Sequence, residues 1–210
     1  MCRSGHNPPK APAALLLLKY QLRLKGAQKM RKFGAGLAAV LAAAGLGLVA
    51  PGPASAATYC GISWGSMAKA DLDWSAANVT NVRTGQQPCY DRLVIDMTGK
   101  VAGYVVQYVP VVTQDATGYP IPVLGDADLQ VMVTAPSYNQ YSQPTYEPAA
   151  KAELSNVSGY QTFRQVVYAG SFEGTTSIGL GVRARLPFRV FTLDGPGGGS
   201  RLVVDVAHRW

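Results

Sequence analysis

The sequence predicts an all-β fold, an antiparallel sandwich or barrel, and three observations support this prediction. Segments in which Val, Ile, Tyr and Phe alternate with polar residues dominate the chain after Val79, as is typical of half-buried strands. Clusters of Gly, Pro, Asn and Asp separate these segments. No segment combines a 3.6-residue repeat with capping residues, so we expect neither intervening helices nor a parallel α/β sheet.

Eight strands are expected. They cover, in chain order, Val79–Arg83, Asp91–Met97, Val101–Val109, Leu129–Ala135, Thr162–Ala169, Thr175–Leu186, Phe188–Leu193 and Arg201–His208. Thr98-Gly99 indicates a tight hairpin after the second of them. The longest irregular stretch runs from Pro136 to Gly159, and a loop of that length usually carries a function or is mobile.

Two of these strands contain nearly the same five residues. Arg92–Asp96 reads R-L-V-I-D and Arg201–Asp205 reads R-L-V-V-D. In both, alternation places the apolar side chains on one face and the Arg and Asp side chains on the other. We interpret the repeat as a pseudo-twofold sandwich in which each sheet contributes one such strand; the alternative is coincidence.

The formal net charge of +7 comes from the beginning of the chain. The first 56 residues carry eight Lys or Arg and no acid, which leaves eleven basic and twelve acidic residues in the remainder. The remainder is therefore close to neutral, and it lacks the basic footprint of a protein that binds a phosphate backbone. We expect no nucleic-acid partner.

The basic leader has the order of a secretory signal peptide. Arg31 and Lys32 precede an apolar run from Leu37 to Ala50, and an Ala-Ser-Ala sequence ends at Ala56. We expect residues 30–56 to be a cleaved signal peptide and residues 1–29 to be a start-site artefact or a disordered leader. The alternative is an uncleaved anchor, because residues 33–50 are largely apolar. Cleavage predicts a secreted protein that contacts the membrane only through this peptide.

The cysteines agree with export. Cys2 lies in the leader, and the mature chain keeps Cys60 and Cys89. An even count in an oxidising compartment predicts a disulfide, which would tie an N-terminal segment, residues 57–78, to a domain formed by residues 79–210. Two cysteines far apart in sequence, with almost no His nearby, do not indicate a zinc site.

Several short strings resemble a known family. V-T-N-V-R at Val79–Arg83, D-R-L-V-I-D at Asp91–Asp96, and the strings at Pro187–Phe191 and Arg201–Val206 resemble the AMIN domain. The strings Phe163–Gln165, Gly170–Gly174 and Gly179–Arg189 are more similar to the AMIN-like domain of exported proteins from high-GC Gram-positive bacteria. The resemblance covers about residues 60 to 210.

The resemblance implies a β-sandwich of two small sheets. By analogy with the AMIN modules of amidases and secretins, it also implies localisation to the cell envelope through peptidoglycan. Those modules normally accompany a catalytic or assembly domain, which we do not expect here.

One motif suggests catalysis. Gly61–Gly65 reads G-I-S-W-G, a match to the nucleophile elbow of serine hydrolases, with His208 downstream. The elbow needs a central strand before it and a helix after it, but only six mature residues precede Ser63. We therefore expect no catalytic residue, and we expect Trp64 to pack near the disulfide.

The sequence gives equally little indication of a metal site or of an acid-base pair. The D-x-D pairs Asp71/Asp73 and Asp126/Asp128 offer too few ligands for a calcium loop, and the mature chain has a single His. A pair of catalytic carboxylates would require convergence that the sequence does not reveal. We expect no metal and no cofactor.

Three arginines form the stronger candidate for a binding surface. Arg183 and Arg185 alternate with apolar residues in the predicted strand Thr175–Leu186, so both guanidinium groups should leave the same face about 7 Å apart. Arg189 follows after Pro187. A planar guanidinium suits carboxylate or phosphate recognition. The alternative is that these arginines make ordinary ion pairs across strands with Glu173, Asp96 or Asp205.

Three tyrosines in the long irregular stretch are candidates for stacking on sugars. Tyr138, Tyr141 and Tyr146 combine an apolar ring with a hydroxyl group. Alternatively, this proline-containing loop folds over the sandwich and its rings cover the edges of the core. At the end of the chain, we expect His208 and Trp210 to cap the last strand.

We therefore expect an exported, non-catalytic binding module at the cell wall, with peptidoglycan or an anionic wall polymer as its partner. The expected ligand-binding residues are Arg183, Arg185, Arg189, Tyr138, Tyr141 and Tyr146. An extracellular protein-interaction or structural module without glycan affinity is the first alternative. A serine hydrolase that uses Ser63 is disfavoured.

Overall fold

The computed structural model describes residues 58–100 and 103–210. The leader, the signal peptide and the beginning of the strand expected from Val101 lie outside the described residues. Within them the fold is all-β, with one 3₁₀ turn at Pro196–Gly198. No helix of the described part has the length and apolar character needed to cross a bilayer.

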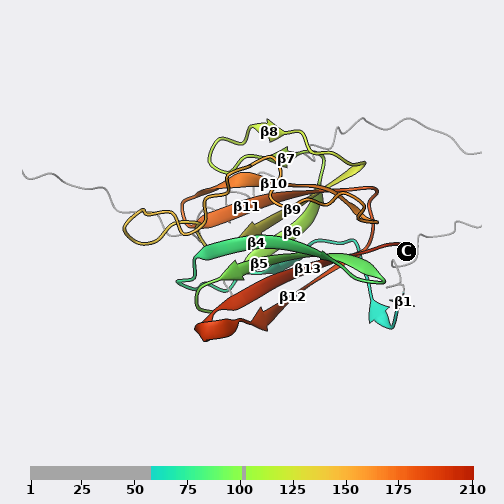
Figure 1. Ribbon diagram of the computed structural model, residues 1–210, viewed down its shortest axis with the longest axis horizontal. Coiled ribbons are helices and arrows are strands. Elements are labelled where there is room, and N and C mark those ends of the chain that lie inside the picture. Colours follow the sequence, from blue (N-terminus) through green and yellow to red (C-terminus); the bar gives the residue numbers. More distant parts are fainter. Residues whose placement is uncertain (1–57, 101–102) are drawn as a thin grey trace, which may run out of the picture. The chain divides into compact units, whose positions relative to one another are not determined.

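Two antiparallel sheets form the two layers seen in Figure 1. The five-stranded sheet has the order β10 (Phe163–Phe172), β11 (Thr175–Val182), β9 (Ala127–Val133), β6 (Tyr104–Val109), β3 (Lys69–Asp71). The four-stranded sheet has the order β12 (Phe188–Asp194), β13 (Ser200–Ala207), β5 (Tyr90–Met97), β4 (Val79–Gln86). Two short ribbons complete the fold: β1 (Thr58–Tyr59) with β2 (Ile62–Ser63), and β7 (Val112–Thr113) with β8 (Pro120–Ile121).

The core lies between the two sheets because alternate residues of each strand are apolar. Leu93 and Ile95 of β5 face inward, as do Leu202 and Val204 of β13, and all four are almost fully buried. Leu129 of β9 lies among the buried residues from the opposite sheet. Burial of a side chain of this size contributes about 1.5–3 kcal/mol. The predicted sandwich of two sheets is thus confirmed.

Each of the eight predicted strands corresponds to an observed strand, and the largest difference in bounds is the early end of β11. β11 stops at Val182 instead of Leu186, because the chain must leave the five-stranded sheet there and enter β12 of the other sheet. Residues 183–185 are bends. The strands β1, β2, β3, β7 and β8 were not predicted, since two or three residues are too few to show alternation.

The interpretation of the five-residue repeat was wrong. Both copies lie in the same sheet, where β5 and β13 are antiparallel neighbours. Their register places Arg92 opposite Asp205, and Asp96 opposite Arg201. An R-x-x-x-D segment paired antiparallel with a second copy brings each Arg to the other's Asp, which explains the repeat as cross-strand charge pairing.

The glycines of β11 allow another segment to cross over the outer face of the five-stranded sheet. A Cβ atom on Gly181 would lie 1.9 Å from the Leu124 carbonyl oxygen. A Cβ atom on Gly179 would lie 2.7 Å from Val167 Cγ2 and 2.8 Å from Val112 Cγ1. The Gly-x-Gly string therefore permits close packing of the segment that contains the β7–β8 ribbon.

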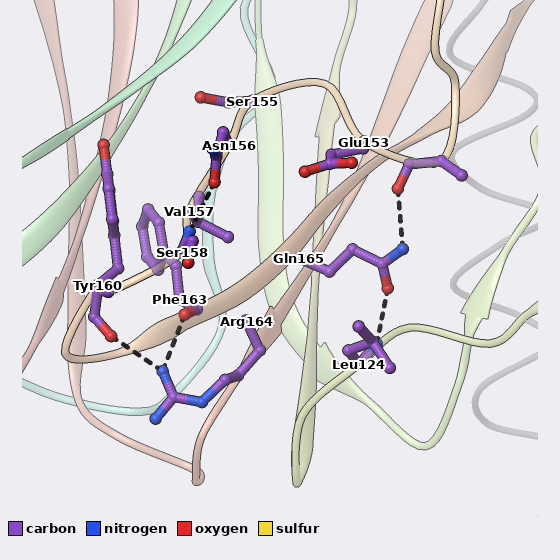
Figure 2. Close-up of a pocket in the computed structure, with 12 residues that line it drawn as sticks. Leu124, Glu153, Ser155, Asn156, Val157, Ser158, Tyr160, Phe163, Arg164 and Gln165 are labelled. Atoms are coloured by element: carbon purple, nitrogen blue, oxygen red, sulfur yellow. Dashed lines mark hydrogen bonds between the residues drawn. The ribbon is translucent and has the colours of Figure 1, made fainter.

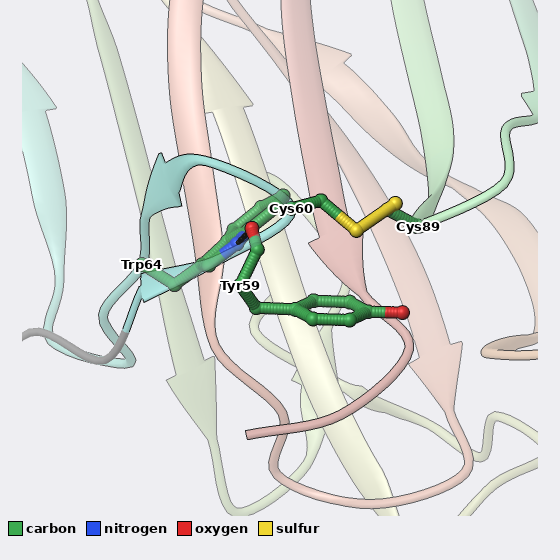
Figure 3. The surroundings of a disulfide bond; sticks show 4 residues. All are labelled: Tyr59, Cys60, Trp64 and Cys89. Carbon is green, nitrogen blue, oxygen red and sulfur yellow. Dashed lines mark hydrogen bonds between the residues drawn. A yellow bond between two sulfur atoms is a disulfide. The ribbon is translucent and has the colours of Figure 1, made fainter.

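The predicted disulfide is present between Cys60 and Cys89. It joins the turn between β1 and β2 to the turn between β4 and β5 (Figure 3). Trp64 is buried in the same corner, where its indole Nε1 donates a hydrogen bond of 2.8 Å to the Tyr59 carbonyl oxygen. The disulfide thus holds the N-terminal ribbon against the domain.

Candidate functional site

A hollow of about 540 Å³ lies where β10 meets residues 152–160 (Figure 2). We call this the Arg164 hollow, and its lining includes Glu153, Asn156, Tyr160, Phe163 and Arg164. Its volume falls within the range of small-molecule sites in proteins. The following contacts determine its shape.

One wall is held along the outer edge of β10. The backbone N–H of Leu154 donates to the Val166 carbonyl oxygen (2.8 Å), and the N–H of Tyr168 donates to the Lys151 carbonyl oxygen (2.7 Å). Gln165 ties two segments to the strand, because its Nε2 donates to the Ala152 carbonyl oxygen and its Oε1 accepts the N–H of Leu124, each at 2.8 Å (Figure 2). The edge of β10 is therefore covered.

The same wall is also bound to β4 of the other sheet. The Thr84 hydroxyl lies 2.6 Å from Ser155 Oγ and 3.1 Å from the Tyr160 hydroxyl. Gln86 Nε2 donates to the Gly159 carbonyl oxygen at 3.0 Å. Residues 152–160 thus bridge the edges of both sheets. Because these contacts fix the wall in place, the hollow is preformed. The sequence predicted a functional or mobile loop over residues 136–159, and its second half forms this wall.

The hollow has an apolar floor and charged margins. Phe163 is fully buried, and its ring stacks on Tyr160 with centroids 6.1 Å apart. The Arg164 guanidinium donates to the carbonyl oxygens of Tyr160 (3.1 Å) and Phe163 (2.9 Å). Within residues 58–100 and 103–210, neither Arg164 nor Glu153 forms an ion pair. Both side chains are exposed.

Arg183 and Arg185 do not lie on one strand face as predicted. Arg183 donates a hydrogen bond to the carbonyl oxygen of His208. Arg185 lies over the Tyr108 ring, 4.7 Å from its centroid, at a separate hollow of about 490 Å³. The expected spacing on one strand was wrong, because β11 ends before both residues.

Arg189 takes the alternative that the sequence left open, an ion pair with Asp205. Asp205 is fully buried, and its carboxylate accepts hydrogen bonds from Arg189 Nε (2.8 Å), Arg92 Nε (2.6 Å) and Arg92 Nη2 (2.9 Å). This bonding raises the pKa of Arg92. The rings of Tyr90 and Phe191 lie within 5.5 Å of both guanidinium carbons. Aromatic contact and a buried carboxylate together account for the position of Arg189.

The three tyrosines also differ in their surroundings. Tyr141 is 73% exposed. Tyr138 is half-buried, and its hydroxyl accepts the N–H of Gly174 at 3.3 Å. Tyr146 packs edge to face against Tyr168, and burial raises the pKa of Tyr146. The Tyr146 ring thus covers the core, Tyr138 is tied to the turn at Gly174, and Tyr141 is the most exposed of the three.

Ser63 and His208 do not form a catalytic pair in the structure. Ser63 is exposed on the β2 ribbon, whereas His208 is buried and its Nε2 lies 3.1 Å from Asp91 Oδ1. His208 Nδ1 has no hydrogen-bond partner within the described residues. Asp91 also accepts the backbone N–H groups of Thr162 (2.5 Å) and Phe163 (3.0 Å), so the pair fastens the last strand to β10.

The described residues contain no group of three or more His, Cys, Asp or Glu side chains that could hold a metal ion. The D-x-D pairs are separated from each other. Asp126 and Asp128 lie at the hollow beside Arg185, and Asp71 ends the edge strand β3.

Arg164 and Glu153, which line this hollow, were not among the residues that the sequence singled out as ligand-binding candidates. Arg164 lies in the Phe163–Gln165 string, which indicated the family but did not indicate a binding role. Glu153 is brought to the hollow by backbone pairing with β10, which its own sequence does not indicate.

Comparison with known proteins agrees with this architecture. The family model of the AMIN-like domain matches residues 77–208, which is more than half of the chain. The comparisons with curated proteins and with solved structures gave no match.

Proposed function

The chain belongs to the AMIN-like domain family, and from this premise we propose that it is an exported, non-catalytic module that binds peptidoglycan at the Arg164 hollow. The family indicates a cell-envelope-related module, and its domains are typical of envelope or secreted proteins. Export, peptidoglycan as the ligand and the absence of catalysis are the finer parts of the proposal. The single observation that carries it is a guanidinium without a carboxylate partner among the described residues, at the margin of a hollow of ligand size.

The chemistry of the margins supports a glycan-peptide ligand. Peptidoglycan offers stem-peptide carboxylates, and a guanidinium binds a carboxylate through two parallel hydrogen bonds. Its sugars offer hydroxyl and acetamido groups, for which Glu153, Asn156 and Ser158 supply acceptors and donors in the lining. The domain is close to neutral and places one cation and one anion at the hollow. This arrangement suits a mixed polar ligand better than a ligand that carries charges of one sign.

The floor and the wall support the same ligand class. The partly exposed face of Tyr160 can cover the apolar face of a sugar ring. The wall is tied to both sheets, so little conformational entropy is lost when a ligand binds. An open, preformed hollow favours reversible holding of a polymer.

The absence of catalysis is supported by the surroundings of the two hydrolase candidates. Ser63 lies on a two-residue strand without the helix that an elbow requires, and His208 is engaged with Asp91 inside the fold.

The test is co-sedimentation of the full chain with purified peptidoglycan sacculi. The wild type should pellet with the sacculi, and the double variant Arg164→Ala/Glu153→Ala should lose affinity by ~10-fold or more, the value of one charged hydrogen bond. Arg209→Ala, which removes an exposed arginine stacked on Tyr59, is the matched control and should bind normally. Absence of wild-type binding overturns the proposal.

A further inference from the structure

A second hollow, of about 540 Å³, lies on the outer face of the four-stranded sheet. Its charged lining consists of Arg83 from β4, Asp96 from β5 and Arg201 from β13, and the glycine-rich turn Gly195–Gly199 closes one side. We propose that this hollow binds a phosphate group, as a monoester or as a phosphodiester. The site shares no lining residue with the Arg164 hollow, and the inference does not depend on peptidoglycan binding.

The hollow carries one surplus positive charge. Arg83 is bonded to Asp96 by Nε (2.8 Å) and Nη2 (3.0 Å), which neutralises one guanidinium. Arg201 lies opposite Asp96 in the β13–β5 register, yet its Nη2 donates to the carbonyl oxygen of Asp194 instead of a carboxylate. Two cations and one anion therefore line the hollow, so an added anion is favoured electrostatically.

Two donors in this lining lack a protein acceptor. Arg201 Nε is shielded from solvent and has no hydrogen-bond partner within the described residues. The backbone N–H of Gly197, an exposed residue of the turn, has no protein acceptor within the same residues either, so only Arg201 Nε is a buried donor without a partner. An unsatisfied buried donor costs about 1–3 kcal/mol, and a ligand that accepts its hydrogen bond recovers part of this.

The arrangement of the donors favours phosphate over a carboxylate. The donors come from three separate elements: Arg83 from β4, Arg201 from β13 and Gly197 from the turn between β12 and β13. A tetrahedral oxyanion presents oxygens in several directions and can meet all three. A planar carboxylate is served fully by a single guanidinium. The turn is not a nucleotide-binding loop, because a strand follows it, so the arginines supply the charge.

The test is titration of the ¹⁵N-labelled full chain with inorganic phosphate, with glycerol phosphate polymer and with acetate, at constant ionic strength. We expect saturable shifts of the Gly197 and Thr98 amide signals with a phosphate probe, and much weaker shifts with acetate. Arg201→Gln and Arg83→Gln should each lower phosphate affinity by ~10-fold. Arg209→Gln, at an exposed arginine that is absent from this lining, should leave the affinity unchanged.

The relative affinities for inorganic phosphate and for the glycerol phosphate polymer identify which kind of phosphate the hollow binds. Tighter binding of the polymer per phosphate supports a phosphodiester ligand, and tighter binding of inorganic phosphate supports a monoester. Equal responses to acetate and phosphate, or the absence of saturation with any probe, overturn the proposal. Both arginine variants are checked by their melting temperature, so loss of folding is separated from loss of binding.

Discussion

Arg92 of β5 and Asp205 of β13 lie directly opposite each other, with Arg92 Nε 2.6 Å from Asp205 Oδ1. The carboxylate is fully buried, while the Arg92 side chain is 25% exposed. Arg189 reaches the same carboxylate from β12, so three neighbouring strands meet at one anion. On the outer face of the four-stranded sheet, these three charged side chains hold β5, β13 and β12 together. On the inner face, apolar packing does so.

Removal of this carboxylate should therefore destabilise the fold. We expect Asp205→Ala to lower the free energy of unfolding by about 3 kcal/mol, because two partly buried guanidinium groups lose their partner. Urea unfolding measures the difference. Asp194→Ala, at an exposed carboxylate, is the control and should change stability by less than about 0.5 kcal/mol. Equal effects of both variants would contradict this account of Asp205.

The disulfide should stabilise the fold by restricting the conformations of the unfolded chain. Cys60 and Cys89 are 29 residues apart, and closing a loop of this length stabilises by roughly 3–4 kcal/mol in the chain-entropy model. The Cys60→Ser/Cys89→Ser variant should unfold at correspondingly lower urea concentration. Reduced wild-type protein should behave like the variant, and an unchanged midpoint in both would reject the assigned role.

Stability should fall at alkaline pH because of Tyr108. Burial raises the pKa of Tyr108 from 10.0 to about 12, so the folded chain keeps the phenol proton that the unfolded chain releases. The stabilisation is complete below pH 10 and is lost as the pH rises toward 12, by up to roughly 2–3 kcal/mol. Unfolding measured across this window should show the loss.

Tyr108→Phe provides the control for that pH dependence. The variant removes the 2.6 Å hydrogen bond from the hydroxyl to the Leu186 carbonyl oxygen, at a cost of about 1 kcal/mol. Its stability should then decline less between the same two pH values. An identical decline in both proteins would assign the effect to another group.

The two arginines expected on one strand should now behave differently. Arg185 is exposed beside a hollow, whereas Arg183 is held by the His208 carbonyl oxygen. Arg183→Ala should lower the melting temperature, since a charged hydrogen bond is worth about 1.5–3 kcal/mol, and Arg185→Ala should have a smaller effect. Thermal unfolding compares them. If Arg185→Ala also weakens binding to sacculi, the wall-binding surface extends to that second hollow.

The long strands of this fold were predictable from the sequence because their apolar residues alternate over five or more positions. Leu93 and Ile95, for example, are buried as that pattern requires. Sheet membership was not predictable, since the same alternation fits either layer. For this reason the two copies of the repeat were assigned to different sheets, although both lie in the four-stranded sheet. The odd residues of β11 do face away from the core up to Gly181, but another segment covers them there.

The candidate site was much less predictable. Arg164, Glu153 and Tyr160 come together because residues 152–160 bond to β10 and β4 at once, and these are long-range contacts of a loop without a periodic pattern. Arg183 and Arg185 satisfied an alternation rule within a strand that ends before them. Tyr138 and Tyr146 were ambiguous, because an amphipathic ring serves core edges and ligands equally well.

The most direct test of the central claim is an NMR titration of the full chain with a soluble disaccharide-peptide fragment of peptidoglycan. We expect saturable shifts concentrated at the amides of Asn156, Val157, Phe163 and Arg164, and their loss in Arg164→Ala/Glu153→Ala. Shifts confined to other faces of the sandwich, or no shifts while the variant remains folded, would contradict the claim that this hollow holds the glycan.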